Sequence, residues 1–334
     1  MANIKSITRE HLQSYISTHY TGPRIVVAGA GAVEHGALSA LAESAFGGLP
    51  ATRLAPALAP PAFVGSQLTL RNDDLNLAYL AIGFETGGWT HPHAFPLMVL
   101  QTLLGVWDRT MGAGPNMASQ LCRLVGSKSL AHSMSCFNTT YTDTGLFGVY
   151  AVTDPHNVWE LSAEILYEMV RLCHNVSPEE VARAKTQLKS SLLGGLDGTT
   201  AICEDIGRQV LTYGRRMSPA EVVARIDAVD AAAVQAAARA YIDDKEVVTA
   251  GAGFCYEMPD ANWCVCFALT GARPARFFAP ASPVAHKPPN PLSLFPAQQV
   301  PEQDVHARRV VAHWRGAQVV VIRTHVERNY VYNK

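Results

Sequence analysis

The sequence predicts an α+β fold in which a small mixed sheet is backed by helices and preceded by the end of a second, similar domain. Two strand-like segments, 66–71 and 78–84, lead into a long apolar segment with helical character. The chain downstream is mostly helical in pattern and closes on a strand of small residues, VVTAGAG, at 247–253. A similar segment, IVVAGAGA, occurs at 25–32, and this similarity indicates an internal duplication.

Length and composition indicate a globular chain with more than one domain. It has 334 residues, of which 48% are hydrophobic and 16% charged. The 27 basic and 28 acidic side chains give a net charge of −1, so the sequence predicts no nucleic-acid partner. Charged residues or glycines interrupt every apolar stretch before the roughly 18 residues that a transmembrane helix needs, so no membrane span is expected.

The first 47 residues predict only a helix, a strand and a second helix, at 8–20, 23–31 and 34–46. One strand between two helices has no sheet neighbours and cannot bury its apolar faces. Residues 1–47 are therefore expected to be the C-terminal remnant of a first domain. The Pro-rich segment 48–64 is expected to be the linker to a second domain at 65–263.

Within 65–263, an apolar helix is predicted at 94–107 and a hairpin at 129–148. The hairpin turn reads TDTG, and Gly145 is expected to adopt a left-handed conformation that closes the loop. Two helix starts are predicted where Ser-Pro is followed by Glu at the third helical position. Such sequences are typical of a capping box, and they begin at Ser177 and Ser218.

The composition changes after about residue 264. Eight prolines fall between residues 274 and 301, and no periodic apolar face is present. We therefore expect 264–334 to be irregular, with one plausible strand, AQVVVIR, at 317–323.

The residues by themselves predict no active site. Neither H-x-x-E-H nor its inverse occurs, and the nearest pair of metal ligands, His91 and His93, flanks a proline in a predicted turn. Glu204 and Asp205 are adjacent on a helix, where side chains point about 100° apart and do not share an ion. The seven cysteines form no CxxC pair and are expected to be reduced, with Cys136 in the core. We expect no catalytic and no metal-binding residue in this chain.

Several ordered segments carry a resemblance that covers about residues 3–263. They include THYTGPRIVVAGAG, GWTHP, FNTTYTDTGLFG and LDGTTAICEDIGRQVLTYGRR. The chain resembles the pitrilysin-type zinc peptidases, in the branch that holds the β-type mitochondrial processing peptidase subunits and the core I subunits of respiratory complex III. The resemblance implies two similar domains and a partner of the α or core II type. It also implies a polar chamber for presequence peptides, and a location in the mitochondrial matrix or on the matrix face of the inner membrane.

Two departures from the family pattern qualify this resemblance. The family's zinc-binding H-x-x-E-H and distal Glu precede the position of Asn3, so zinc belongs to the full-length family, and this chain is expected to hold no cofactor and to be inactive alone. We hypothesise that both ends reflect an incomplete or misjoined gene model. An Arg and a Tyr that family members place before the hairpin fall on Val125 and His132, which cannot make the same contacts.

The hairpin is accordingly predicted to be a chamber wall, with Phe137 and Tyr141 on one face and His132 as a further lining candidate. The alternative is that this face packs inside the domain. Three functions stay open: a fragment of a processing-peptidase subunit, a structural core subunit of complex III without peptidase activity, and a genuine short form with a binding role for its basic tail.

Overall fold

The computed structural model describes residues 4, 6–51, 61–111 and 117–260, and the backbone of 309–314 and 317–323. Most of the predicted linker and most of the Pro-rich tail lie outside the described residues, as do Cys264 and Cys266. In the described part of the chain, no helix is long and apolar enough to cross a bilayer.

The described helices alternate with short strands in the first half of the chain and follow one another in the second. The helices are α2 (Arg9–His19), α3 (His35–Phe46), α4 (Ala94–Leu104), α5 (Gln120–Lys128), α6 (Val158–His174), α7 (Pro178–Gly194), α8 (Thr199–Tyr213), α9 (Pro219–Asp227) and α10 (Ala231–Tyr241). The strands are β1 (Ile25–Ala30), β2 (Ser66–Arg71), β3 (Ala78–Gly87), β4 (Val106–Asp108), β5 (Ser133–Thr140), β6 (Thr144–Thr153), β7 (Val247–Gly253), β8 (Arg309–Trp314) and β9 (Ala317–Arg323).

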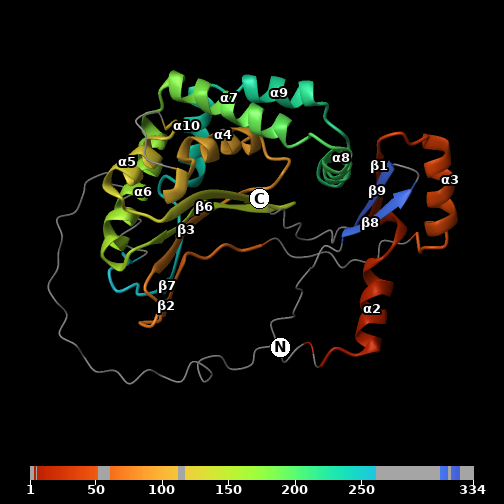
Figure 1. Ribbon diagram of the computed structural model, residues 1–334, viewed down its shortest axis with the longest axis horizontal. Coiled ribbons are helices and arrows are strands. Elements are labelled where there is room, and N and C mark those ends of the chain that lie inside the picture. The colour runs from red at the N-terminus through yellow and green to blue at the C-terminus, as the bar shows by residue number, and fades with distance from the viewer. Residues whose placement is uncertain are drawn as a thin grey trace.

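Six strands form the main sheet in the order β2-β7-β3-β6-β5-β4. The β2–β7 pair is parallel and the other pairs are antiparallel, so the predicted mixed sheet is confirmed. Figure 1 shows helices α4, α5, α6, α7, α9 and α10 gathered on one side of this sheet, with α7 and α9 as an outer layer over α4. Alternate residues of the strands fill the core between sheet and helices, among them Leu80, Ile82, Phe84, Phe147, Val149, Met134 and Cys136. Cys136 thus lies in the core, as predicted.

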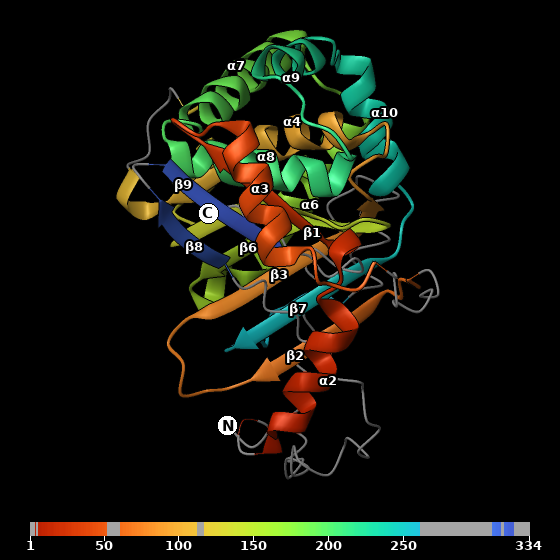
Figure 2. The ribbon, with the colours of Figure 1, turned by 90° about the vertical axis from the view of Figure 1, so that its right-hand side faces the viewer.

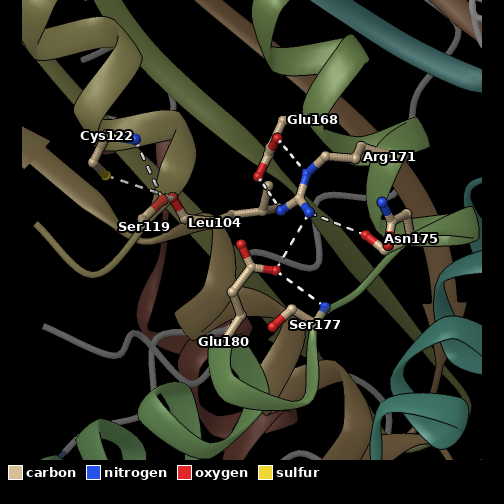
Figure 3. A network of polar contacts seen from close by, with 8 residues as sticks. All are labelled: Leu104, Ser119, Cys122, Glu168, Arg171, Asn175, Ser177 and Glu180. Carbon is tan, nitrogen blue, oxygen red and sulfur yellow. Dashed lines mark hydrogen bonds and ion pairs between the residues drawn. The ribbon is translucent and has the colours of Figure 1, made fainter.

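The helix predicted at 94–107 ends earlier, at Leu104. Gly105 has a φ of +77°, a conformation that favours glycine and breaks the helix. The chain then enters β4, where Trp107 is buried and its Nε1 donates to the carbonyl oxygen of Ala131 at 3.3 Å. The Ser119 hydroxyl, which caps α5, donates to the Leu104 carbonyl at 2.8 Å and so fixes the two helix ends together (Figure 3).

The hairpin is two antiparallel strands, as predicted, but Gly145 does not have the predicted left-handed conformation. It is the second residue of β6 and is buried. A side chain there would lie 2.5 Å from the Thr86 hydroxyl and 2.9 Å from the Gly87 carbonyl oxygen. Glycine is therefore required by the close approach of β3 and not by the shape of the turn.

The expectation that the strand at 25–30 has no sheet neighbour is wrong. β1 pairs antiparallel with β9, which pairs with β8, and the three form a second sheet (Figure 2). β9 is the strand predicted at 317–323, whereas β8 was not predicted in the tail. Helix α8 packs against β1 and β9, and the buried Cys203 thiol donates to the Ala28 carbonyl at 3.1 Å. These contacts supply the burial that β1 could not obtain within residues 1–47.

The two predicted helix starts are confirmed, although they differ in detail. At α7 the Ser177 hydroxyl and the Glu180 carboxylate form the full capping box. At α9 the Ser218 hydroxyl accepts the Glu221 amide at 3.2 Å, but the Glu221 carboxylate bonds to Arg215 and Arg225 instead of the cap. Arginine side chains, which are charged, compete successfully with a single backbone amide for this carboxylate.

The arginine contacts set the titration of Glu221. Hydrogen bonding, first to Arg215 and then to Arg225, lowers the pKa of the Glu221 carboxyl from 4.5 to about 2. Since the folded pKa is depressed, this contribution to stability is fully present above the unfolded pKa of 4.5 and is lost as the pH falls toward 2. Replacing Arg215 with methionine should raise the pH midpoint of the Glu221 titration, measured by carbon NMR of its carboxyl group. The neighbouring Arg216→Met change is the control, and equal midpoints in both variants would contradict the assignment.

All five cysteines in the described residues are free and buried. Burial, followed by the charge of Asp243, raises the pKa of Cys173 to about 12. Because the thiolate is the reactive form, we expect iodoacetamide at pH 8 to leave Cys173 unmodified in the folded protein and to modify it in urea. Peptide mapping by mass spectrometry reads this out. A cysteine introduced at Tyr256, which is 61% exposed, provides a positive control, and equal labelling of both sites would refute the expectation.

Candidate functional site

One face of the six-stranded sheet is turned away from the helices, and we call it the open face. Its side chains follow from the strand register, in which directly paired residues point to the same side. Leu68, Leu70 and Tyr150 on this face are 56%, 60% and 41% exposed. The open face is therefore an apolar and aromatic surface, defined by Leu68, Leu70, Tyr79, Phe137, Leu146, Tyr150 and Ala250.

Phe137 lies on the open face, and its role as a wall residue stays a prediction. It pairs with Gly148, which in turn pairs with Gly83 on β3. The Phe137 ring atom Cζ is 2.7 Å from the place where a Gly148 Cβ would stand and 3.7 Å from the corresponding place at Gly83. Two glycines side by side thus leave a shallow gap in the sheet surface, and the phenylalanine ring fills it.

Tyr141 follows β5 at the turn end of the hairpin. Its amide donates to the Thr144 carbonyl at 2.8 Å, and its own carbonyl accepts the Trp89 amide at 3.0 Å. The Trp89 ring contacts Tyr213 of α8 edge to face, with centroids 6.1 Å apart. The turn is therefore tied to the segment before α4, and this segment reaches α8.

His132 does not join the other two candidates. It precedes β5 at the opposite end of the hairpin, so the strand separates it from Tyr141 by roughly 30 Å at about 3.3 Å per residue. His132 Nε2 lies 3.1 Å from the Asp154 carboxylate, and His132 Nδ1 lies 3.5 Å from the Arg109 guanidinium. Val125 is fully buried on α5 and faces no site. Phe137, Tyr141 and His132 remain predicted lining residues, in two separate places.

Sequence reasoning missed a cavity of about 460 Å³ at the end of β3. It lies between that strand end, the turn that holds His91, and the C-terminal end of α10 with the residues after it. Tyr241 on α10 places its hydroxyl 2.9 Å from His91 Nδ1, across 150 positions of the chain. The only local signal was GWTHP, because the other lining residues come from remote segments.

The described residues do not fit a zinc site. Among them, no group of three or more His, Cys, Asp or Glu side chains is placed to hold a metal ion. The pair His91 and His93 has ring centroids 5.1 Å apart, but His91 Nδ1 is already engaged by the Tyr241 hydroxyl and by the His93 amide. Burial, then the charge of His91, lowers the pKa of His93. No chemical step is therefore assigned to a metal on these residues.

Comparison with known proteins decides the family. The family model described as "Peptidase M16 inactive domain" matches residues 6–188, which is more than half of the chain. The chain belongs to the M16 peptidase family. The pitrilysin-type resemblance is thereby confirmed, and the match runs across the predicted linker into the six-stranded sheet.

Relatives within this family are similar over most of the chain. It is 48% identical over 262 residues to the cattle mitochondrial-processing peptidase subunit beta, covering 78% of this chain and 54% of that protein. It is 47% identical over 264 residues to a probable subunit beta of Arabidopsis thaliana, covering 78% and 50%. Identity to subunit 1 of the cattle cytochrome b-c1 complex is 40% over 263 residues, covering 78% and 55%. The chain thus spans about half the length of the curated relatives that it matches.

A solved structure gives the same fold for this M16 chain. A chain of complex III2 from Candida albicans, with Inz-5 bound, superposes with a TM-score of 0.75 and 25% sequence identity. The match covers 80% of this chain and 64% of that one. Most of the described fold is therefore the fold of a complex III component.

Proposed function

We propose that this chain is part of a β-type subunit of the mitochondrial processing peptidase, which removes presequences from imported precursor proteins. The observation that carries the proposal is the identity of 47–48% to β subunits from an animal and a plant, against 40% to the complex III subunit. The compartment is the mitochondrion, and within it we assign the chain to the matrix side. Its partner is an α-type subunit.

In this proposal the chain supplies a wall of the presequence chamber and contacts with the α-type subunit. The exposed apolar and aromatic side chains of the open face, among them Tyr150, support this role because an extended peptide packs its alternate side chains on such a surface. Phe137 and Tyr141 are assigned to the wall, and His132 to its far end. Hydrolysis by zinc is assigned to residues other than those described.

A photo-crosslinking pair tests the wall. Benzoylphenylalanine replaces Tyr150 on the open face in one variant and Tyr167 on helix α6 in the other; the two positions are 41% and 40% exposed. Each variant is assembled with an α-type subunit and irradiated with a labelled presequence peptide. We expect crosslinking from position 150 and none from position 167. Equal crosslinking from both, or from neither, would overturn the proposal.

A structural role in complex III is the second candidate, and the match to a solved complex III2 chain supports it. The two candidates differ in the assembly that holds the chain. Native electrophoresis of mitochondria, followed by detection of this chain, distinguishes them. Migration with a soluble heterodimer supports the peptidase, whereas migration with detergent-solubilised complex III supports the structural role.

A further inference from the structure

The outer strand of the main sheet, β2, has an open edge. Within the described part of the chain its one hydrogen-bonded neighbour is β7. All six residues of Ser66–Arg71 are exposed, whichever face of the strand they point to. Figure 1 shows β2 at the end of the sheet that lies away from helices α7 and α9. A strand edge that is open to solvent is a template for pairing with another strand.

One hydrogen bond shows which backbone groups face this edge. The amide of Asn72, directly after β2, donates to the Gly253 carbonyl of β7 at 3.1 Å. Successive residues of a strand point their N–H and C=O groups to alternate edges, so the even-numbered residues of β2 also face β7. The N–H and C=O groups of Thr69 and Arg71 therefore point to the open edge.

The side chains of β2 make the edge complementary to itself. In an antiparallel pair of two copies centred on Thr69, Leu68 of each copy faces Leu70 of the other. Both leucines lie on the open face, where they are 56% and 60% exposed. The two Thr69 side chains face each other, and Thr–Thr is a favourable cross-strand pair. Arg71 lies opposite the neutral Gln67, so no like charges meet.

Other antiparallel registers of two β2 strands are less favourable. If the centre moves to Leu68 or to Leu70, one pair of facing leucines forms instead of two. If the centre moves to Arg71, two arginines lie directly opposite each other, and facing like charges destabilise a sheet. The sequence of β2 therefore favours the register that is centred on Thr69.

We propose that a second copy of this chain adds its β2 antiparallel to this edge, with a two-fold axis at Thr69. The two Thr69 residues then exchange two N–H···O=C hydrogen bonds, and the two sheets become one. The open faces of both copies lie on the same side of the joined sheet, because directly paired residues point to the same side. The contact is small, so the association is expected to be weak and to depend on concentration. It uses only the edge of β2 and does not depend on the proposed function.

Cysteines at two positions of β2 test both the contact and its register. They are introduced into the full 334-residue chain with Cys264 and Cys266 replaced by serine, since the five other cysteines are buried. Thr69→Cys sets two thiols opposite each other, within the Cα separation of about 7 Å that a disulfide allows. Ser66→Cys is also exposed, but its two thiols would be roughly 20 Å apart at about 3.3 Å per residue.

Oxidised glutathione should therefore produce a covalent dimer from position 69 and none from position 66. Equal amounts of dimer from both positions would indicate random collision and would overturn the proposal, as would the absence of a dimer from position 69.

Sedimentation velocity measures the association without any crosslink. The sedimentation coefficient of the unmodified chain should rise with protein concentration. Thr69→Lys sets two like charges opposite each other and should weaken the association by about fivefold or more. Thr186→Lys adds the same charge at an exposed position of α7 and should leave the association unchanged. Circular dichroism verifies that both variants fold. A chain that stays monomeric at every concentration, or equal association of the two variants, refutes the β2 contact.

Discussion

Replacing Arg171 with methionine is expected to lower the free energy of unfolding by about 3–5 kcal/mol, the cost of breaking a buried ion pair. Arg171 lies at the centre of a charged network between α6 and α7 (Figure 3). It donates to Glu168 at 2.8 and 2.9 Å, to Glu180 at 3.3 Å and to the Asn175 carbonyl at 3.0 Å. The side chains of Glu168 and Glu180 are only 5% and 14% exposed, so both would be left buried and charged without a cation.

Urea unfolding followed by circular dichroism measures this loss. The control is Arg215→Met, because Arg215 is 52% exposed and pairs with the partly exposed Glu221. Exposed pairs contribute about 1 kcal/mol or less, so this variant should unfold close to the unmodified protein. A difference of less than about 1 kcal/mol between the two variants would show that the α6–α7 network does not stabilise the domain.

The second large effect is expected for Gly148→Ala, which should lower the free energy of unfolding, measured by urea unfolding, by about 1–3 kcal/mol or more. A Cβ at this position would collide with the Ile82 carbonyl oxygen and come within 2.8 Å of the Gly83 Cα, so the backbone of two strands must separate. The new Cβ would also lie 2.7 Å from the Phe137 ring. The phenylalanine side chain could relieve this contact only by moving out of the gap between the two glycines.

Gly83→Ala is a matched control, because Gly83 is the direct partner of Gly148 in the sheet. The nearest atoms to a Cβ at Gly83 lie 3.7 Å away, which is ordinary contact. We expect this change to alter the stability by less than about 0.5 kcal/mol. Equal losses for both variants would show that the close approach at Ile82 is not the cause. Adding Phe137→Ala to Gly148→Ala should recover only the part of the loss that comes from the ring.

Local sequence signals predicted most of the helices and strands between residues 65 and 260. The strands at 66–71 and 247–253 and the starts of α7 and α9 follow from alternation and from cap residues that act within a few positions. The errors arise where distant segments decide. Gly145 is a glycine because of Thr86, and the residues of β1 pair with residues of β9 that lie 288 to 298 positions later in the chain. Neither contact leaves a trace in the neighbouring sequence.

The candidate sites were less predictable than the fold. Strand alternation predicted that Phe137 and Tyr141 share a face, but it could not decide whether that face is turned toward the helices or away from them; the strand register places Phe137 on the side away from the core. The cavity at the end of β3 joins Glu85 and Glu246, which lie more than 150 positions apart, and each looks like an ordinary surface acid when read alone. Pairing along the sheet, which no local pattern specifies, creates both sites.

The insertion of β7 between β2 and β3 has a consequence for the order of folding. A chain that emerges from a ribosome or a membrane pore presents β2 and β3 early, yet neither can pair with the other, since the strand between them is the last of the six. β2 must wait until Gly253 has emerged before it acquires any hydrogen-bonded neighbour in this sheet. Such non-local pairing is slow, and until it occurs the strand edges expose unpaired backbone groups that can aggregate. The edges of β2 and β3 that face each other across the missing β7 therefore stay open to wrong pairing until residue 253 has emerged.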